Sequence, residues 1–201
     1  MKKDIPDFQH IDDFFRLKIR RYMTHLVGES EAEDLTQEVF IKVYSNIGIF
    51  RGDCSLSTWI YKIASNVAID ALRSHIHRQN VLTVAPGEVE AIDEKLLQLT
   101  TKKPSAEQTI IKKQMTECIR GYIQRLPENY RTVLVLSDIE EMNIGDIAII
   151  LRISLHAAKI RLHRARAALK KDLEAHCNFY RDEQNELACD LKTAIDQLKS
   201  S

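Results

Sequence analysis

Positively charged side chains are concentrated in one stretch of this chain. Between Arg152 and Lys171 there are seven Lys or Arg residues and no acidic residue, although the 29 basic and 29 acidic residues of the whole chain cancel. Such a local excess of positive charge gives affinity for a polyanion even where the net charge is zero. Cationic side chains neutralise phosphate groups, while neighbouring side chains can read base edges. The stretch is therefore a candidate nucleic-acid-binding surface.

The local sequence predicts two helices joined by a tight turn at this stretch. Asn143, with Asp146 three residues later, can cap a short helix that ends near Leu151, and Ser154 can cap a long helix. This order is typical of a helix-turn-helix. Arg152 stands where such turns usually place Gly, so we expect its backbone to be left-handed at a cost of about 1 kcal/mol or more.

The long helix has an apolar side and a basic side. Steps of three and four residues predict the inward face, which comprises Leu155, Ala158, Leu162, Ala165 and Leu169. The opposite side carries the candidate DNA contacts, which are His156, Ala157, Lys159, Ile160, Arg161, His163 and Arg164. A basic, merely solvated helix is the alternative. Ile160 is an apolar side chain in the middle of this polar side. A thymine methyl group could cover it, which favours the DNA interpretation. A packing contact with the tail is the alternative explanation.

A second polar surface is predicted nearer the N-terminus. Helical spacing from Leu56 to Ile76 predicts a buried face of Ile60, Ile63, Ala64, Val67 and Ala71. The residues expected to point outward, together with one in the preceding loop, are Arg51, Thr58, Lys62, Ser65, Asn66 and Arg73. Amides, hydroxyls and cations can hold an unpaired strand and bind an unstacked base, and Asn66 is the best candidate for that base. We expect Trp59 to be a core residue.

An acidic helix face is predicted from Asp34 to Asn46. Its packed side is expected to contain Leu35, Val39, Phe40, Val43 and Tyr44. Its outward side, with Asp34, Gln37, Glu38 and Lys42, is too acidic to favour DNA and suits a protein partner.

Composition and spacing together predict an all-α fold. Apolar residues make up 44% of the 201 residues, with only six Gly and four Pro. We expect a helical domain at 8–80, a flexible linker at 81–106, a helix-turn-helix domain at 107–172 and an acidic tail at 173–201. No apolar run reaches the roughly 18 residues of a membrane span and no signal peptide is recognisable, so we expect a cytoplasmic protein without membrane insertion.

Several ordered strings resemble the extracytoplasmic-function (ECF) sigma factors. Asp34-Leu-Thr-Gln-Glu-Val-Phe40, Phe50-Arg-Gly-Asp53, Ser57-Thr-Trp-Ile60 and Ala64-Ser-Asn-Val-Ala-Ile-Asp-Ala-Leu-Arg73 are similar to their region 2. Leu126-Pro-Glu-Asn-Tyr-Arg131, Asp146-Ile-Ala148 and Lys159-Ile-Arg-Leu-His-Arg-Ala-Arg166 are similar to region 4.

The resemblance implies a transcription initiation factor that works with core RNA polymerase on promoter DNA. The acidic helix would meet the polymerase clamp, the Arg51-to-Arg73 surface would melt the minus-ten element, and the basic helix would read minus-thirty-five. It also implies an anti-sigma factor as a partner. Ala157 and Ile160 replace small polar residues that are common in the family, so promoter specificity does not carry over from relatives.

Two other classes of protein were weighed. A dimeric helix-turn-helix repressor would leave the acidic helix and Asn66 without a role. An enzyme would have to use Asp53, Cys54 and the seven histidines, which show no catalytic spacing, so no catalytic residue and no cofactor are predicted.

The tail has its own open questions. Its acids could fold back on the basic helix and compete with DNA. Cys177 and Cys189 could form a disulfide or, with His176, part of a metal site, but spare thiols are favoured and no metal site is predicted.

Overall fold

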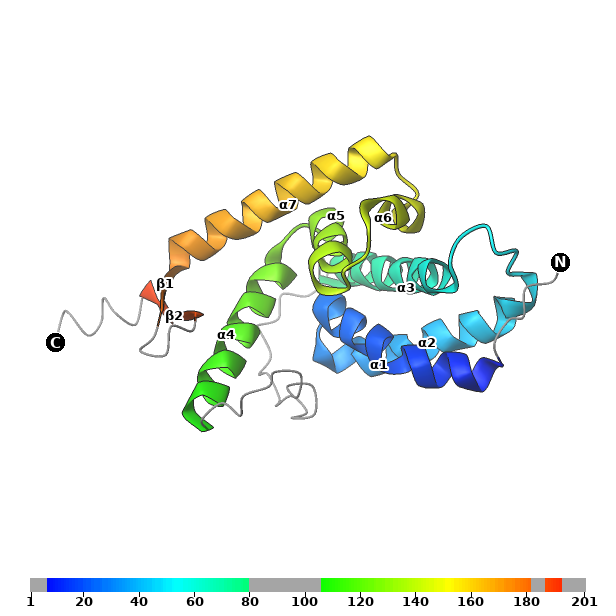
Figure 1. Cartoon of the computed structure of the whole chain (residues 1–201), viewed down its shortest axis with the longest axis horizontal. Coiled ribbons are helices and arrows are strands. Elements are labelled where there is room, and N and C mark those ends of the chain that lie inside the picture. Colours follow the sequence, from blue (N-terminus) through cyan, green and yellow to red (C-terminus); the bar gives the residue numbers. More distant parts are fainter. Residues whose placement is uncertain (1–6, 80–105, 182–186, 193–201) are drawn as a thin grey trace. The chain divides into compact units, whose positions relative to one another are not determined.

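A computed structural model describes residues 7–79, 106–181 and 187–192. These residues belong to two compact units (Figure 1). Among the described residues, the first unit combines the N-terminal helices with residues 127–165, and the second combines residues 106–126 with residues 166–181 and 187–192. Most of the predicted linker, 81–106, lies outside the described residues.

Three helices form the N-terminal part of the first unit: α1 (Phe8–Val27), α2 (Glu29–Asn46) and α3 (Leu56–Gln79). Gly28 separates α1 from α2 with φ 99°, a left-handed value that favours glycine and lets the chain reverse at once. A 3-10 turn, η1 (Ile47–Ile49), follows the end of α2. The largest fully buried side chains of these helices include Ile19, Tyr22, Leu26, Val39, Val43 and Ile60.

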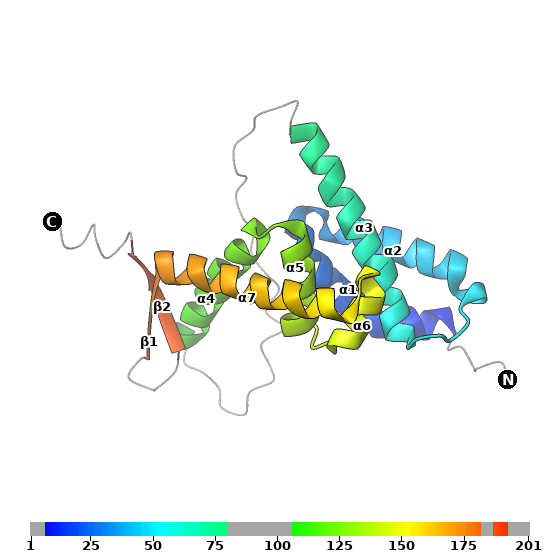
Figure 2. The same ribbon diagram turned by 90° about the horizontal axis from the view of Figure 1, so that it is seen from above.

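Residues 128–134 and 144–151 of the first unit pack on α3 (Figure 2). Helix α5 (Glu128–Leu134) starts after Pro127 and continues as a π-helical turn, η3 (Val135–Ile139). Helix α6 (Ile144–Leu151) and α7 (Leu155–His176) follow. The buried residues of α5, η3 and α6 include Val133, Val135, Leu136, Ile147 and Ile150.

A buried carboxylate connects the helices of this unit. Arg21 donates two hydrogen bonds of 3.2 Å to the Glu140 carboxylate, whose side chain is only 2% exposed. Tyr61 donates a further hydrogen bond to the same carboxylate. Burial first, and then the negative charge of Glu140, raise the pKa of Tyr61 far above its usual value, so its hydroxyl remains a donor.

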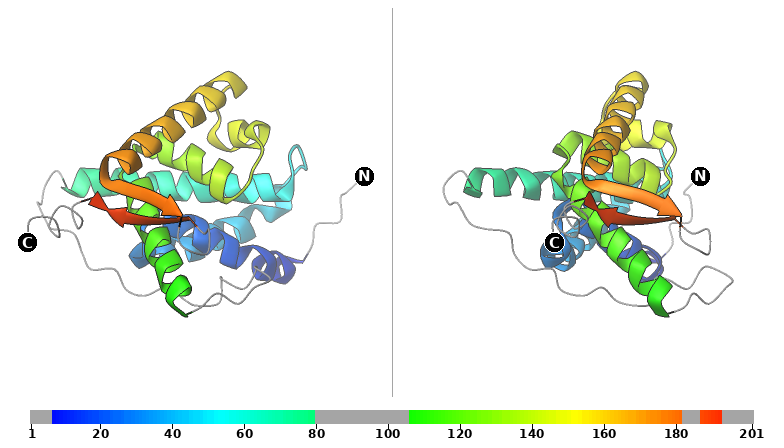
Figure 3. Two further views of the ribbon diagram at one scale, coloured as in Figure 1. Left: turned by 60° about the vertical axis from the view of Figure 1, so that its left-hand side comes forward. Right: turned by 90° about the vertical axis from the view of Figure 1, so that its left-hand side faces the viewer.

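The second unit contains α4 (Ala106–Arg125), the end of α7 and a hairpin of two strands. Strands β1 (Cys177–Arg181) and β2 (Leu187–Leu191) are antiparallel, with Cys177 opposite Leu191 and Phe179 opposite Cys189. Figure 3 shows the hairpin beside α4. The sequence interpretation found little support for β structure, and the hairpin corrects it. Each strand has only five residues, which is too short for a recognisable periodicity. Cross-strand pairs stabilise such strands, and these pairs join residues that are distant in sequence.

Two expectations about the packed faces were wrong. Tyr44 is 66% exposed and Leu155 is 47% exposed, although both were expected to face inward. Each lies near an end of its helix, where the neighbouring elements no longer cover the apolar stripe. Within the part of the chain that the structure describes, no helix is long and apolar enough to cross a membrane.

Candidate nucleic-acid and partner interfaces

Local hydrogen bonds build the helix-turn-helix as the sequence predicted. The Asn143 side chain accepts a bond of 2.9 Å from the Asp146 amide at the start of α6. Arg152 ends α6 in a left-handed conformation, φ 53° and ψ 45°, and Ser154 then caps α7 by accepting from the Ala157 amide at 3.1 Å. These contacts set where α7 begins, and therefore which of its side chains face away from the unit.

The outward face of α7 is basic and contains most of the predicted minus-thirty-five contacts. Ala158 and Ala165 are fully buried and set the opposite side of the helix. His156, Lys159, His163 and Arg164 are exposed, Ile160 is 37% exposed, and Ala157 and Arg161 are half-buried at the edges. A helix with cations around one accessible apolar side chain can bind phosphates and still reach a thymine methyl group.

A cleft of about 370 Å³ collects several candidate minus-ten residues beside α3. Lys62 and Asn66 line it together with Trp59, Lys42 and Arg152. Lys42, which the sequence placed on the protein-binding face, thus also borders the candidate DNA surface. The ring of Trp59 is half-buried and lies 5.3 Å from that of Phe50, centroid to centroid. Cations, an amide and an indole around one cleft could hold an unstacked base and its phosphate.

The remaining exposed candidates of this surface lie outside the cleft. Arg51 is exposed in the loop before α3. Arg73 is exposed as well, and its guanidinium lies 3.6 Å from the carboxylate of Glu128. This exposed ion pair is screened by solvent and contributes little to stability.

Thr58 was expected to point outward, and this expectation was wrong. Its side chain is fully buried, where its hydroxyl lies 2.7 Å from Ser55 Oγ and donates to Asp146 Oδ1 at 3.0 Å. Helix α6 packs on this end of α3, so a position that faces away from α1 and α2 is still covered. Thr58 therefore cannot touch DNA while α6 lies there.

Ser65 was likewise wrongly placed on the outer surface. It is 1% exposed, and its hydroxyl lies 2.7 Å from that of Tyr22, which is also buried. Burial raises the pKa of Tyr22 well above its usual value. Ser65 therefore belongs to the packing of α1 on α3, whereas the next residue, Asn66, is exposed.

The exposed side of α2 combines charge with two large apolar side chains. Asp34, Gln37 and Glu38 are exposed as predicted, and Lys42 pairs with Glu38 at 2.7 Å. Ile41 is 65% exposed and Tyr44 is 66% exposed on the same helix. The sequence analysis did not name Ile41, and it placed Tyr44 on the packed side. Ile41 lies off the apolar stripe of α2, and this position could have indicated that it is exposed.

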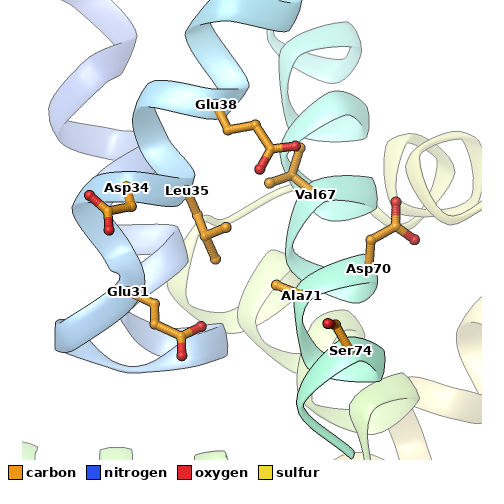
Figure 4. A pocket seen from close by; sticks show the side chains of 8 residues that line it. All are labelled: Glu31, Asp34, Leu35, Glu38, Val67, Asp70, Ala71 and Ser74. Atoms are coloured by element: carbon orange, nitrogen blue, oxygen red, sulfur yellow. The ribbon is translucent and has the colours of Figure 1, made fainter. Parts of the chain in front are cut away.

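An acidic groove of about 430 Å³ lies between α2 and α3 (Figure 4). In the close view Leu35 and Ala71 lie between the two helices, and Glu31 and Glu38 extend from α2 on either side of Leu35. Such a groove suits the aliphatic stem and charged head of a Lys or Arg side chain from a partner. The lining residues are Glu31, Asp34, Leu35, Glu38, Val67, Asp70, Ala71 and Ser74.

Comparisons with known proteins agree with this arrangement. Residues 15–77 match the family described as sigma-70 region 2, and residues 116–169 match sigma-70 region 4. The chain is 34% identical over 175 residues to the ECF RNA polymerase sigma factor SigW of Bacillus subtilis, which covers 86% of this chain and 91% of that protein. It is 30% identical to the RNA polymerase sigma-H factor of Pseudomonas aeruginosa, with 80% of this chain and 86% of the relative covered.

Solved structures show the same fold at lower identity. The sigma factor RpoE of Bartonella quintana, in complex with the anti-sigma factor NepR, matches with a TM-score of 0.65 and 18% identity over 85% of this chain and 98% of that one. CnrH, in complex with the cytosolic domain of CnrY, matches with a TM-score of 0.55 and 19% identity over 84% and 88%.

The fold, the helix-turn-helix and the order of the two matched segments define a transcription initiation subunit that recognises promoters. Within that class, the chain belongs to the ECF group of the sigma-70 family.

Proposed function

We propose that this chain binds core RNA polymerase through the exposed side of α2, melts the minus-ten element at the cleft beside α3 and reads minus-thirty-five with α7. Residues 8–80 would perform the first two tasks and residues 107–172 the third. The chain would act in the cytoplasm by binding rather than by catalysis, without inserting into a membrane. Its promoter contacts would come from Arg51, Lys62, Asn66 and Arg73 in the first segment.

The observation that carries the proposal is the outward face of α7. Its cations lie opposite the buried Ala158 and Ala165, and two local caps set its first turn. A solvated surface helix has no need of a preceding capped helix and a left-handed turn, whereas a helix-turn-helix uses them to hold its second helix in the major groove.

An anti-sigma factor is a further partner that we propose. The two structures similar in fold, RpoE and CnrH, were solved in complex with NepR, an anti-sigma factor, and with the cytosolic domain of CnrY respectively. Ile41 and Tyr44 offer exposed apolar area of the kind that protein interfaces cover.

Reconstituted transcription tests the proposal. Core RNA polymerase with this chain should produce defined transcripts from fragmented genomic DNA that core polymerase alone does not produce. The double variant Lys159→Ala/Arg164→Ala should still co-elute with core polymerase yet lose most of these transcripts. The control Lys170→Ala/Lys171→Ala removes the same charge further along α7 and should retain them. DNA binding without any polymerase-dependent transcript would instead indicate a simple helix-turn-helix regulator.

A further inference from the structure

Three of the four cysteines lie close together in the second unit, although they are far apart in sequence. Cys118 is on α4, Cys177 is the first residue of β1 and Cys189 is on β2. Helix α4 packs on β2, and the Tyr122 ring, one turn after Cys118, lies 5.7 Å from the ring of His176, the residue before Cys177. All three are reduced. The remaining thiol, Cys54, belongs to the first unit.

The hairpin register decides which thiols can be joined. Cys177 pairs with Leu191 and Cys189 pairs with Phe179, so the two strand cysteines are diagonal neighbours. Diagonal Cα atoms in a sheet lie roughly 7–8 Å apart, beyond the roughly 7 Å that a disulfide spans without backbone movement. The Cys177–Cys189 disulfide that the sequence spacing allowed is therefore disfavoured. Cys118 is the thiol that α4 presents one turn before Tyr122, whose ring meets that of His176, the residue before Cys177.

The surroundings keep the reduced pair uncharged. Cys177 is 3% exposed and Tyr122 is 6% exposed, while the Arg125 guanidinium lies 4.9 Å from the centre of the Tyr122 ring. Burial first, and then the nearby Cys177, raise the pKa of Cys118, against the opposing charge of Arg125. Because the thiolate is the reactive form of cysteine, this burial slows the reaction of the half-buried Cys118 with an oxidant.

We propose that Cys118 and Cys177 form a reversible disulfide when the protein meets a hydroperoxide. The thiolate form of Cys118 attacks one peroxide oxygen and breaks the O–O bond, which gives a sulfenic acid and, from hydrogen peroxide, a hydroxide ion. The hydroxide ion takes up the proton that the thiol lost and becomes one water molecule. The Cys177 sulfur then attacks the Cys118 sulfur and displaces the hydroxyl group as a second water molecule. Two thiols lose two electrons and two protons, and the peroxide is reduced to two water molecules. A dithiol reductant reverses the reaction.

The disulfide would fasten the start of β1, where α7 ends, to α4. It would close a loop from residue 118 to residue 177, about 60 residues. Closing a loop of this length lowers the conformational entropy of the unfolded chain. The oxidised protein should therefore melt several degrees higher than the reduced protein.

Peptide mapping of the full chain tests the proposal. Reduced protein is treated with hydrogen peroxide, remaining thiols are alkylated, and cross-linked peptides are identified by mass spectrometry before and after dithiothreitol. We expect the Cys118–Cys177 peptide in the unchanged protein and in the matched controls Cys54→Ser and Cys189→Ser. Melting of both redox forms is followed in parallel, with Cys118→Ser as the variant that should show no upward shift on oxidation.

Three results would overturn the proposal. The first is a cross-link that joins Cys177 to Cys189 as the main product in the unchanged protein. The second is oxidation of Cys118 to sulfinic or sulfonic acid without a cross-link. The third is an equal melting temperature for the oxidised and reduced forms. The mapping of the unchanged protein decides the matter even if Cys118→Ser does not fold.

Discussion

The hydroxyl oxygens of Ser65 and Tyr22 lie 2.7 Å apart in a site from which solvent is almost excluded. This contact joins α3 to α1 and places the next residue, Asn66, on the exposed side of α3. Two adjacent polar residues therefore have separate roles, one in the core and one on the proposed DNA surface.

Ser65→Ala should lower the free energy of unfolding by about 1–3 kcal/mol, because it leaves the buried Tyr22 hydroxyl without its partner. Urea denaturation measures this loss. At a temperature where the variant is folded, promoter opening should be normal. The double variant Ser65→Ala/Tyr22→Phe should recover part of the stability, and failure to recover any would show that the hydrogen bond is not the cause.

Asn66→Ala should leave stability and assembly with core polymerase unchanged, since its side chain is exposed. Fewer thymines of the minus-ten element should react with permanganate, because the amide that we assign to an unstacked base is missing. Ser65→Ala is the matched control from the adjacent position. Normal permanganate reactivity in Asn66→Ala would remove Asn66 from the melting surface.

Arg164→Ala and Arg161→Ala should both weaken binding to minus-thirty-five DNA. If Arg164 contacts a phosphate, affinity falls alike on all promoters and the slope of log K against log salt decreases by about one. If it contacts a base, one position of the element loses discrimination by about 1–3 kcal/mol. Half-buried Arg161 should give the smaller effect. Binding titrations over a range of salt concentrations separate these cases, and two unaffected variants would refute the assignment.

Ile41→Ala/Tyr44→Ala should weaken the complex with core polymerase at least tenfold while changing unfolding little, because both side chains are exposed. Phe14→Ala/Leu17→Ala is the matched control, since it removes apolar side chains of similar exposure from α1. Competition against a labelled sigma subunit measures both affinities. Equal weakening by the two double variants would indicate non-specific hydrophobic binding rather than a defined interface.

Stability should fall at alkaline pH. The pKa values of Tyr22 and Tyr61 are raised in the folded state, first by burial. Their contribution to stability is therefore complete below the unfolded pKa of about 10 and is lost progressively as the pH rises above it. Urea denaturation between pH 8 and pH 11 should show this loss. Tyr61→Phe should flatten it, and an unchanged slope in that variant would exclude Tyr61 as a source.

Local interactions explain why the helix-turn-helix could be predicted from the sequence. The caps at Asn143 and Ser154 and the left-handed Arg152 involve residues at most four positions apart, so their geometry is encoded where it is used. The accessible side of α7 followed from the same helical period, because its inward stripe packs mainly at Ala158 and Ala165.

Contacts between distant segments decided the rest. Helical periodicity assumes one buried side, but α3 packs against α1, α2 and α6, so Thr58 and Ser65 are buried on sides that the sequence marked as exposed. For the same reason, periodicity did not predict that Tyr44 is exposed or that Cys118 and Cys177 lie near each other in the fold. The sequence by itself thus determined the family, most of the helices and the exposed basic face of α7. Only the tertiary structure decided which polar and thiol groups are covered, because coverage depends on neighbours that no local pattern contains.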